Sequence, residues 1–229
     1  MHSSRDLEWD GCVNARDLGG FPTPAGPTAY GVFVRSDNAR KLTDAGWQAA
    51  RDYGITTVLD LRSDPECTAD PPDRDGFDHV RLSLMDHFDS DMDYRARILE
   101  QVADLDEAAR HRVLYSQALD VDAPRFAEVV RVLADADGAV LIHCLGGKDR
   151  TGLITALLLR LVDVPVEEID DDYVVSGTRL PPPAVTPRGV MDTVLAELGD
   201  VRAYLTAAGV EPDRLDRIVA RLRPPVHDR

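Results

Sequence analysis

One short segment of the chain combines a candidate nucleophile with candidate anion-binding groups. The segment reads His143-Cys144-Leu145-Gly146-Gly147-Lys148-Asp149-Arg150-Thr151-Gly152. A cysteine thiolate is a strong nucleophile, and the guanidinium of Arg150 can contact two phosphate oxygens at once. A nucleophile and a phosphate clamp in the same loop predict attack on a phosphate ester.

The elements on either side of this loop favour anion binding. The apolar run 139–142 predicts a strand buried on both faces, and 152–162 predicts a strongly apolar helix. Ligands of α/β sheets bind where a strand ends and a helix begins, because the helix N-terminus offers unpaired N–H groups and positive potential. That potential also favours the Cys144 thiolate. The predicted phosphate-binding residues are Leu145, Gly146, Gly147, Lys148, Asp149 and Arg150, with the two glycines allowing the backbone to turn its amides inward.

Other kinds of loop share parts of this pattern. A lone cysteine is usually buried and inert, but the glycines and cations at these spacings are not expected around a structural cysteine. A Walker nucleotide loop needs Gly at position 142 and Ser or Thr at 149, where this sequence has Ile142 and Asp149. A sulfurtransferase also uses a cysteine loop and is a weaker alternative.

Strand-like and helical patterns alternate along the chain. Strands are expected at 32–34, 56–59, 79–84 and 139–142, and helices at 43–53, 124–136, 152–162, 166–176, 187–197, 200–208 and 212–222. This alternation predicts an α/β fold with a mainly parallel central sheet flanked by helices. The 229 residues contain no repeat or low-complexity linker, so we expect a single domain, 1–229, with an acidic helical insertion at about 87–120.

Composition narrows the class of protein. The formal net charge of −15 argues against non-specific nucleic-acid binding. The three cysteines, Cys12, Cys67 and Cys144, form no C-x-x-C pair, so neither a zinc site nor a disulfide framework is indicated. The N-terminus lacks the apolar stretch of a signal peptide, and the longest apolar stretch, 153–164, is too short to span a bilayer. We expect a cytoplasmic protein without a transmembrane segment.

The loop also resembles a known signature. Cys144, five residues and then Arg150 make the C-x5-R pattern of protein tyrosine phosphatases, and the full loop resembles a bacterial tyrosine phosphatase family that also contains atypical lipid phosphatases. Further segments are similar to that family in the same order along the chain. They are Asn14-Ala15-Arg16-Asp17-Leu18-Gly19-Gly20, Val34-Arg35-Ser36-Asp37, Leu42-Thr43-Asp44-Ala45-Gly46, Asp60-Leu61-Arg62 and the closing helices from Ala203 to Leu222.

The resemblance implies roles for the loop residues. Cys144 would attack phosphorus to give a cysteinyl-phosphate that water hydrolyses, while Arg150 holds the equatorial oxygens. Thr151 would donate a hydrogen bond to the sulfur as it leaves, and His143 would order the loop and help set the protonation state of the thiol. The tyrosine-phosphatase-like mechanism requires no metal or cofactor, because the loop itself supplies the positive charge.

The resemblance leaves the general acid open between two aspartates. One is Asp149 inside the loop, and the other is Asp86, which follows the expected strand 79–84. Asp17 and Asp60 are expected to be structural, orienting Arg16, Arg35 or the loop backbone. The insertion after Asp86 is shorter and more acidic than in the resembling family, which puts a two-helix lid in doubt.

The resemblance implies that the substrate is a phosphorylated protein. The enzyme would hydrolyse phosphotyrosine, and dual or triple specificity would add phosphoserine and phosphothreonine. A phosphoinositide or small-metabolite phosphatase is the alternative, because the resembling family links the lysine here numbered Lys148 to phosphoinositides. A catalytically silent phosphate-binding module is a third interpretation, against which the intact Cys144 and Arg150 argue.

Overall fold

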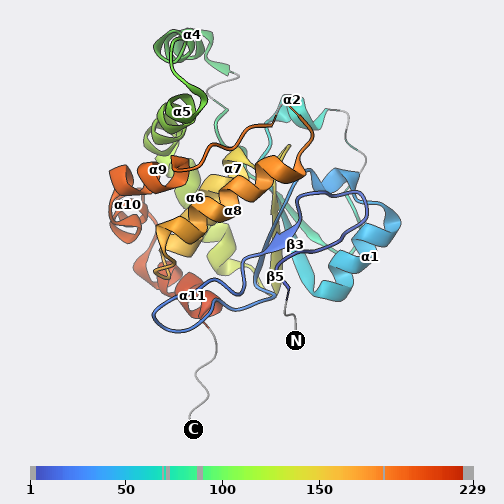
Figure 1. Ribbon diagram of the computed structural model, residues 1–229. Helices are drawn as coiled ribbons and strands as arrows, with labels where there is room; N and C mark the ends of the chain where they lie inside the picture. The colour runs from blue at the N-terminus through green and yellow to red at the C-terminus, as the bar shows by residue number, and fades with distance from the viewer. Residues whose placement is uncertain (1–3, 69, 71–72, 87–89, 183, 224–229) are drawn as a thin grey trace.

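A twisted central sheet organises the molecule (Figure 1). The computed structural model describes residues 4–68, 70, 73–86, 90–182 and 184–223. Within these residues the sheet has the strand order β1-β2-β5-β3-β4, and β1 alone is antiparallel to its neighbour. The strands are β1 (Arg16–Asp17), β2 (Phe33–Ser36), β3 (Ile55–Asp60), β4 (Asp78–Arg81) and β5 (Ala139–His143).

Helices cover both faces of the sheet. Helix α1 (Asp44–Tyr53) lies on one side, and α6, α7, α8 and α11 lie on the other (Figure 1). The further helices are the 3-10 helix η1 (Ala39–Lys41), α2 (Asp64–Cys67), α4 (Met92–Gln101), α5 (Glu107–Val121), α6 (Ala123–Asp135), α7 (Asp149–Arg160), α8 (Val166–Arg179), α9 (Val190–Leu198), α10 (Val201–Ala207) and α11 (Pro212–Leu222). The predicted fold class, α/β with a mainly parallel sheet flanked by helices, is confirmed.

Strand β5 is the central strand that carries the loop. Its residues alternate between the two faces, with Val140 and Ile142 in the larger core and Ala139 and Leu141 in the smaller core beneath α1. All five residues of the strand are buried. This two-sided burial fixes the register of β5, and therefore the point at which Cys144 leaves the sheet.

Capping residues set the ends of several helices as the sequence indicates. Thr43 caps α1 by accepting a hydrogen bond from the Gly46 amide at 3.3 Å, and Gly54 ends the helix with φ +97°. Helix α7 begins at Asp149, earlier than the expected 152. Asp149 and Arg150 therefore belong to the first helical turn, where the backbone amides have no intrahelical partners.

The described residues of the expected insertion include the helices α4 and α5. Helix α5 packs against α9 and α6, whereas α4 stands further from the body of the molecule (Figure 1). Residues 87–89, at the start of the expected insertion, lie outside the described residues. No helix among the described residues is long and apolar enough to cross a bilayer.

Candidate active site

The loop after β5 turns its carbonyl groups toward the scaffold. Three consecutive carbonyls accept hydrogen bonds from the N-terminal part of the chain. The Asn38 amide donates to Leu145 O at 3.1 Å, Asn14 Nδ2 donates to Gly146 O at 3.0 Å, and the Arg35 guanidinium donates to Gly147 O. Gly147 has φ +64°, and a Cβ there would lie 2.2 Å from the Ser36 carbonyl oxygen. The close backbone approach thus requires glycine at 147.

The same geometry turns the amide groups of the loop the other way. In a trans peptide the N–H of one residue points opposite to the carbonyl of the residue before it, so the Gly146, Gly147 and Lys148 amides face away from the scaffold. Within the described ranges, no acceptor receives the amides of Leu145 through Lys148. Successive unpaired amides next to a helix N-terminus form an anion nest. Cys144, which is 2% exposed, lies at the foot of this nest.

Arg150 is held in place by a carboxylate that the sequence analysis missed. Arg150 Nη2 donates to Glu66 Oε1 at 2.7 Å, Arg150 Nη1 donates to Glu66 Oε2, and Glu66 also accepts from the Ser63 amide at 2.8 Å. Burial alone would raise the pKa of Glu66, but the hydrogen bonds from Arg150 and Ser63 outweigh it and lower the pKa to about 2. The Ser63–Glu66 capping box was a local signal for α2, but its spacing does not indicate Arg150 as a partner.

Glu66→Gln should make the stability of the fold less dependent on pH in acid. The Glu66 pKa falls from 4.5 to about 2 on folding. Its carboxylate therefore stabilises the fold fully above about pH 4.5, and this contribution is lost as the pH falls toward about 2. We expect the difference in unfolding free energy between wild type and Glu66→Gln to shrink over that range, measured by urea denaturation at each pH. Glu128→Gln is the matched control, because Glu128 is partly exposed and pairs with Arg125 at 3.0 Å. A difference for Glu66→Gln that grows in acid contradicts the pairing.

A buried ion network supports the loop from beneath. Asp172 of α8 accepts from Arg16 Nε at 3.0 Å and also pairs with Arg35 and Arg5. Arg16, Arg35 and Asp172 are each at most 2% exposed. Burial alone would raise the pKa of Asp172, but the three arginines hold it well below its usual range. Because Arg35 also donates to Gly147 O, the network sets the position of the loop.

Asp172→Asn should destabilise the fold strongly, because it leaves Arg16 and Arg35 buried beside a neutral amide. Breaking a buried ion pair from one side costs about 3–5 kcal/mol, and we expect a loss of that order in the free energy of unfolding measured by urea denaturation near neutral pH. The control is Asp171→Asn on the same helix, whose partner Arg188 is exposed. A loss no larger than that of Asp171→Asn would show that the network does not stabilise the fold.

The two aspartates that were expected to be structural accept hydrogen bonds from neighbouring groups. For Asp17 the expected role, orienting Arg16, Arg35 or the loop backbone, stays a prediction. The Asp17 carboxylate accepts from the Gly19 and Gly31 amides and from the Tyr53 hydroxyl. Asp60 accepts from the Arg62 amide at 3.0 Å and from Arg62 Nε at 2.9 Å, so it orients Arg62 after β3.

His143 and Thr151 lie on either side of the nest. The Ala39 amide donates to His143 Nδ1 at 3.4 Å. Burial is the main cause that lowers the pKa of His143 to about 4, so the imidazole is neutral near pH 7. The Thr151 hydroxyl is buried and makes no hydrogen bond to any described residue, so the expected contact with the Cys144 sulfur is not formed in this conformation.

The two candidate acids have different surroundings. Asp149 Oδ1 accepts from the Tyr115 hydroxyl and lies 3.2 Å from Lys148 Nζ. Asp86 follows β4 and accepts from the Ser83 hydroxyl. Between β4 and Asp86, the Leu84 amide donates to Leu61 O at 3.3 Å. This hydrogen bond brings the segment that carries Asp86 beside the carboxyl end of β3.

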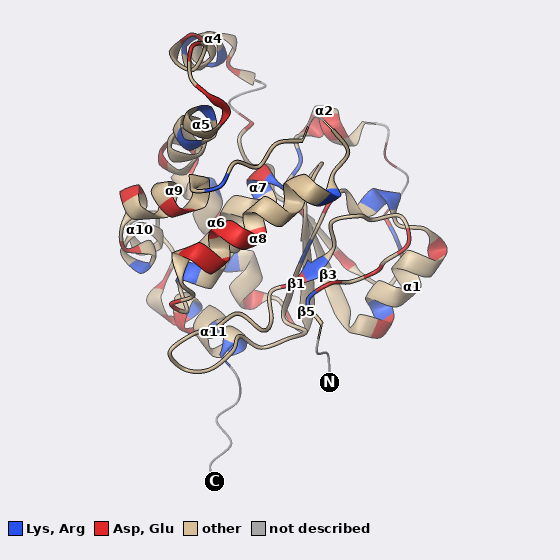
Figure 2. Cartoon of the chain, viewed as in Figure 1, with Lys and Arg blue, Asp and Glu red and all other residues tan. Residues whose placement is uncertain are grey.

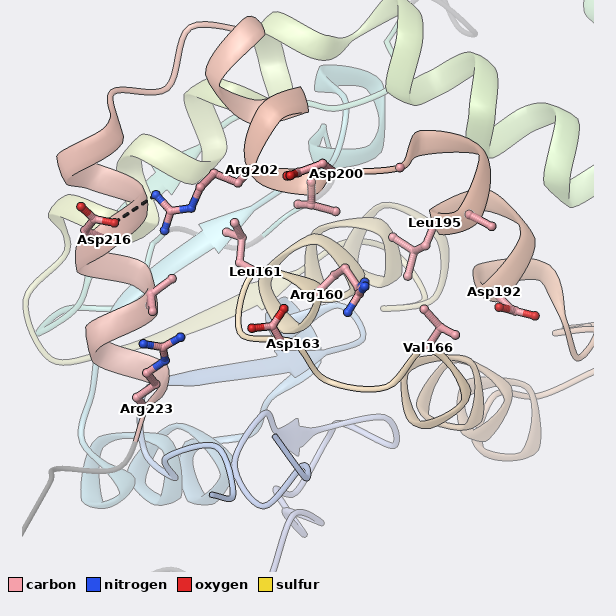
Figure 3. A pocket seen from close by; sticks show the side chains of 14 residues that line it. Arg160, Leu161, Asp163, Val166, Asp192, Leu195, Asp200, Arg202, Asp216 and Arg223 are labelled. Atoms are coloured by element: carbon pink, nitrogen blue, oxygen red, sulfur yellow. Dashed lines mark ion pairs between the residues drawn. The ribbon is translucent and has the colours of Figure 1, made fainter. Parts of the chain in front are cut away.

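A separate cavity lies at the far end of α7 from the loop (Figure 3). Its volume is about 730 Å³, and it lies between the ends of α7, α9, α10 and α11. Its lining includes the Arg202–Asp216 ion pair at 3.0 Å but none of the predicted phosphate-binding residues and no cysteine. The candidate chemistry therefore belongs to the loop and not to this cavity.

The fold and the cysteine nest are those of a phosphatase-like α/β protein, and comparison with known proteins specifies the family. Residues 7–187 match the model of the tyrosine phosphatase family. The chain therefore belongs to the tyrosine phosphatase family.

Two sequence relatives agree with this assignment. A tyrosine-protein phosphatase of Nostoc commune is 40% identical over 151 residues, which are 64% of this chain and 48% of that protein. The triple specificity protein phosphatase PtpB of Mycobacterium tuberculosis is 33% identical over 201 residues, 76% of this chain and 70% of that protein. The match thus spans about half the length of the Nostoc protein. The crystal structure of P. aeruginosa TpbA aligns with a TM-score of 0.44 at 16% identity, covering 77% of this chain and 86% of that one.

Proposed function

We propose that this chain is a cysteine-dependent phosphomonoester hydrolase that acts on phosphotyrosine in proteins, with phosphoserine and phosphothreonine as further substrates. The observation that carries the proposal is the nest itself. The amides of Leu145 through Lys148 lie between Cys144 and Arg150 and have no acceptor among the described residues. The name of the mycobacterial relative, a triple specificity phosphatase, supports the range of substrates.

In the proposed reaction the Cys144 thiolate attacks phosphorus. The sulfur–phosphorus bond forms as the bond to the leaving oxygen breaks, and that oxygen takes a proton from an aspartic acid. Water then attacks the cysteinyl-phosphate, giving inorganic phosphate and restoring the thiolate. The nest amides and Arg150 stabilise the negative charge on the equatorial oxygens, and we propose that no metal or cofactor takes part.

Arg150 can serve this reaction without leaving Glu66. A guanidinium has five N–H donors. The pair with Glu66 uses two of them, and Leu61 O accepts a third at 3.5 Å. Two donors remain for phosphate oxygens. Glu66 thus fixes the plane of the clamp in advance, which lowers the entropy lost on binding substrate. Because the mechanism needs a reduced thiol, we also propose that the protein works in the cytoplasm.

Release of inorganic phosphate from synthetic peptides tests the proposal. Peptides of one sequence that carry phosphotyrosine, phosphoserine or phosphothreonine should all be hydrolysed, with phosphotyrosine giving the highest kcat/KM. Folded protein that binds phosphate but releases none from any peptide would instead be a phosphate-binding module.

The lipid alternative depends on Lys148, whose amine already has partners. Lys148 Nζ donates to Val185 O at 3.0 Å and lies 3.2 Å from His111 Nε2. The side chain is 14% exposed. To meet a second phosphate, the amine must give up these contacts, whereas a singly phosphorylated residue makes no such demand. The arrangement therefore favours a protein substrate over a phosphoinositide.

Lys148→Ala should lower kcat/KM by a similar factor for a phosphotyrosine peptide and for a phosphoinositide with two or more phosphates. The expected reason is loss of general positive potential, which fades as salt rises. The measured quantity is the ratio of the two kcat/KM values at moderate salt. A direct contact with a second phosphate would change that ratio about tenfold or more, the scale of a hydrogen bond to a charged group, and would favour the lipid substrate.

A further inference from the structure

Helix α5 touches the loop through two side chains one helical turn apart. His111 Nε2 lies 3.2 Å from Lys148 Nζ, and the Tyr115 hydroxyl donates to Asp149 Oδ1. Residues four apart share one face of a helix, so a single face of α5 meets two consecutive residues of the loop. The insertion is thus physically joined to one of the two candidate acids.

The Tyr115 hydroxyl is a fixed donor. Tyr115 is 2% exposed, and its oxygen lies 3.0 Å from the Tyr173 hydroxyl oxygen. Tyr115 donates its one hydroxyl proton to Asp149 Oδ1, so its oxygen accepts from the Tyr173 hydroxyl. Burial is the main cause that raises the pKa of Tyr115 well above its usual value, so the hydroxyl keeps its proton across the working range of pH.

The described contacts of the Asp149 carboxylate are made by only one of its two oxygens. Tyr115 and Lys148 both approach Oδ1. The Asp149 side chain is 42% exposed, so Oδ2 can face a substrate while Oδ1 is held from behind. Asp86 has no comparable support from a distant element among the described contacts, since its carboxylate accepts from the nearby Ser83.

We propose that Tyr115 is a positioning residue that holds Asp149 as the general acid, an inference that rests on the proposed phosphatase function. Asp149 gives the proton on Oδ2 to the leaving oxygen as the oxygen–phosphorus bond breaks and the sulfur–phosphorus bond forms. The negative charge left on the carboxylate is then stabilised at Oδ1 by the hydrogen bond from Tyr115. In the second step the carboxylate takes a proton from the attacking water. The hydrogen bond from Tyr115 strengthens as this charge develops, so it favours the transition state over the bound substrate.

The test uses two substrates that differ in leaving group, p-nitrophenyl phosphate and phenyl phosphate. Phenolate is the poorer leaving group and needs the acid more. Asp149→Asn should lower the ratio of kcat/KM for phenyl phosphate to kcat/KM for p-nitrophenyl phosphate, because kcat/KM reports the step in which the leaving group departs, and Asp86→Asn should not. Tyr115→Phe should lower this ratio about tenfold, the scale of one hydrogen bond to a charged group. In the Asp149→Asn background, Tyr115→Phe should change the ratio no further.

Tyr204→Phe is the matched control. The Tyr204 hydroxyl donates to Leu119 O of α5 at 2.6 Å, so the variant removes an equivalent hydrogen bond to the same helix without touching the loop, and the ratio should stay at the wild-type value. Should Tyr115→Phe fail to fold, Tyr173→Phe removes the donor to Tyr115 and should lower the ratio by ~2–3-fold.

The outcomes separate this inference from the proposed function. Normal hydrolysis of p-nitrophenyl phosphate with an unchanged ratio in Tyr115→Phe, or in Tyr173→Phe where that variant is used, overturns the positioning role alone. An equal fall in the rates for p-nitrophenyl phosphate and phenyl phosphate also overturns the positioning role, because a merely structural role of Tyr115 would lower both rates alike. Wild-type protein that hydrolyses neither substrate overturns the proposed function and this inference with it.

Discussion

Cys144→Ser is expected to remove phosphatase activity while leaving the fold and phosphate binding intact. Serine keeps the shape of the side chain, but its hydroxyl is not ionised near pH 7 and is a poor nucleophile without a base. Loss of a covalent nucleophile costs on the order of 10⁵-fold or more in kcat, so the remaining rate should equal the background. Cys144 is buried at the foot of the nest, and the amides that bind phosphate belong to the residues after it.

The measurements are steady-state hydrolysis of p-nitrophenyl phosphate and phosphate binding by calorimetry. Cys67→Ser is the matched control, because Cys67 lies in α2 and forms no part of the loop. It should retain wild-type turnover. Persistent turnover in purified Cys144→Ser protein, or an equal loss in Cys67→Ser, would rule out Cys144 as the nucleophile.

Arg150→Ala is expected to lower kcat and to raise KM together. The guanidinium contacts phosphate oxygens in both the bound substrate and the transition state, so its loss weakens both. An arginine that stabilises a phosphoryl-transfer transition state contributes ~10³–10⁵-fold in rate, and kcat/KM should fall by at least that range. Removal of Arg150 also leaves Glu66 without its bidentate partner, which places a bare carboxylate beside the nest.

Arg150→Lys and the double variant Arg150→Ala with Glu66→Gln separate these two effects. Lysine keeps the positive charge but not the planar fork, so Arg150→Lys should recover binding more than rate. If the unpaired Glu66 carboxylate causes part of the KM increase, the double variant should bind phosphate more tightly than Arg150→Ala alone. A kcat unchanged in Arg150→Ala would contradict the clamp.

The loop could be predicted from sequence because its parts are adjacent along the chain. The buried strand before Cys144, the two glycines and the helix that follows all lie within one short stretch. The start of α7 was placed three residues late, since only its apolar residues show a helical period and its first turn, Asp149-Arg150-Thr151, is polar. Alternation of strands and helices was enough to indicate the fold class.

The supporting carboxylates could not be predicted, because tertiary packing chooses their partners. Glu66 lies 84 positions from Arg150, and Asp172 lies 137 positions from Arg35. Arg16 and Asp17 are adjacent in β1. Consecutive residues of a strand point to opposite faces, however, so in β1 the two side chains diverge and Arg16 reaches α8 instead.

The acidic character of the chain is compatible with an anionic substrate, because its charges are not evenly distributed. Aspartate and glutamate residues gather on α8 and α2, while the ribbon is blue at basic residues at the start of α7 (Figure 2). At the loop itself, Lys148 pairs with Asp149 and Arg150 pairs with Glu66, so the unpaired amides supply the positive potential that favours an anion. The net charge of −15 therefore predicts non-specific repulsion of polyanions rather than the chemistry of the site.

Trapping the covalent intermediate tests the central claim most directly. Wild-type protein is mixed with p-nitrophenyl phosphate, quenched in acid within the first turnover, digested and analysed by mass spectrometry. The account predicts one phosphorylated peptide, carrying phosphate on the sulfur of Cys144, which is absent when Cys144→Ser protein is treated in the same way. Phosphate found on another residue, or first-turnover product formed with no phosphorylated Cys144, would contradict the account.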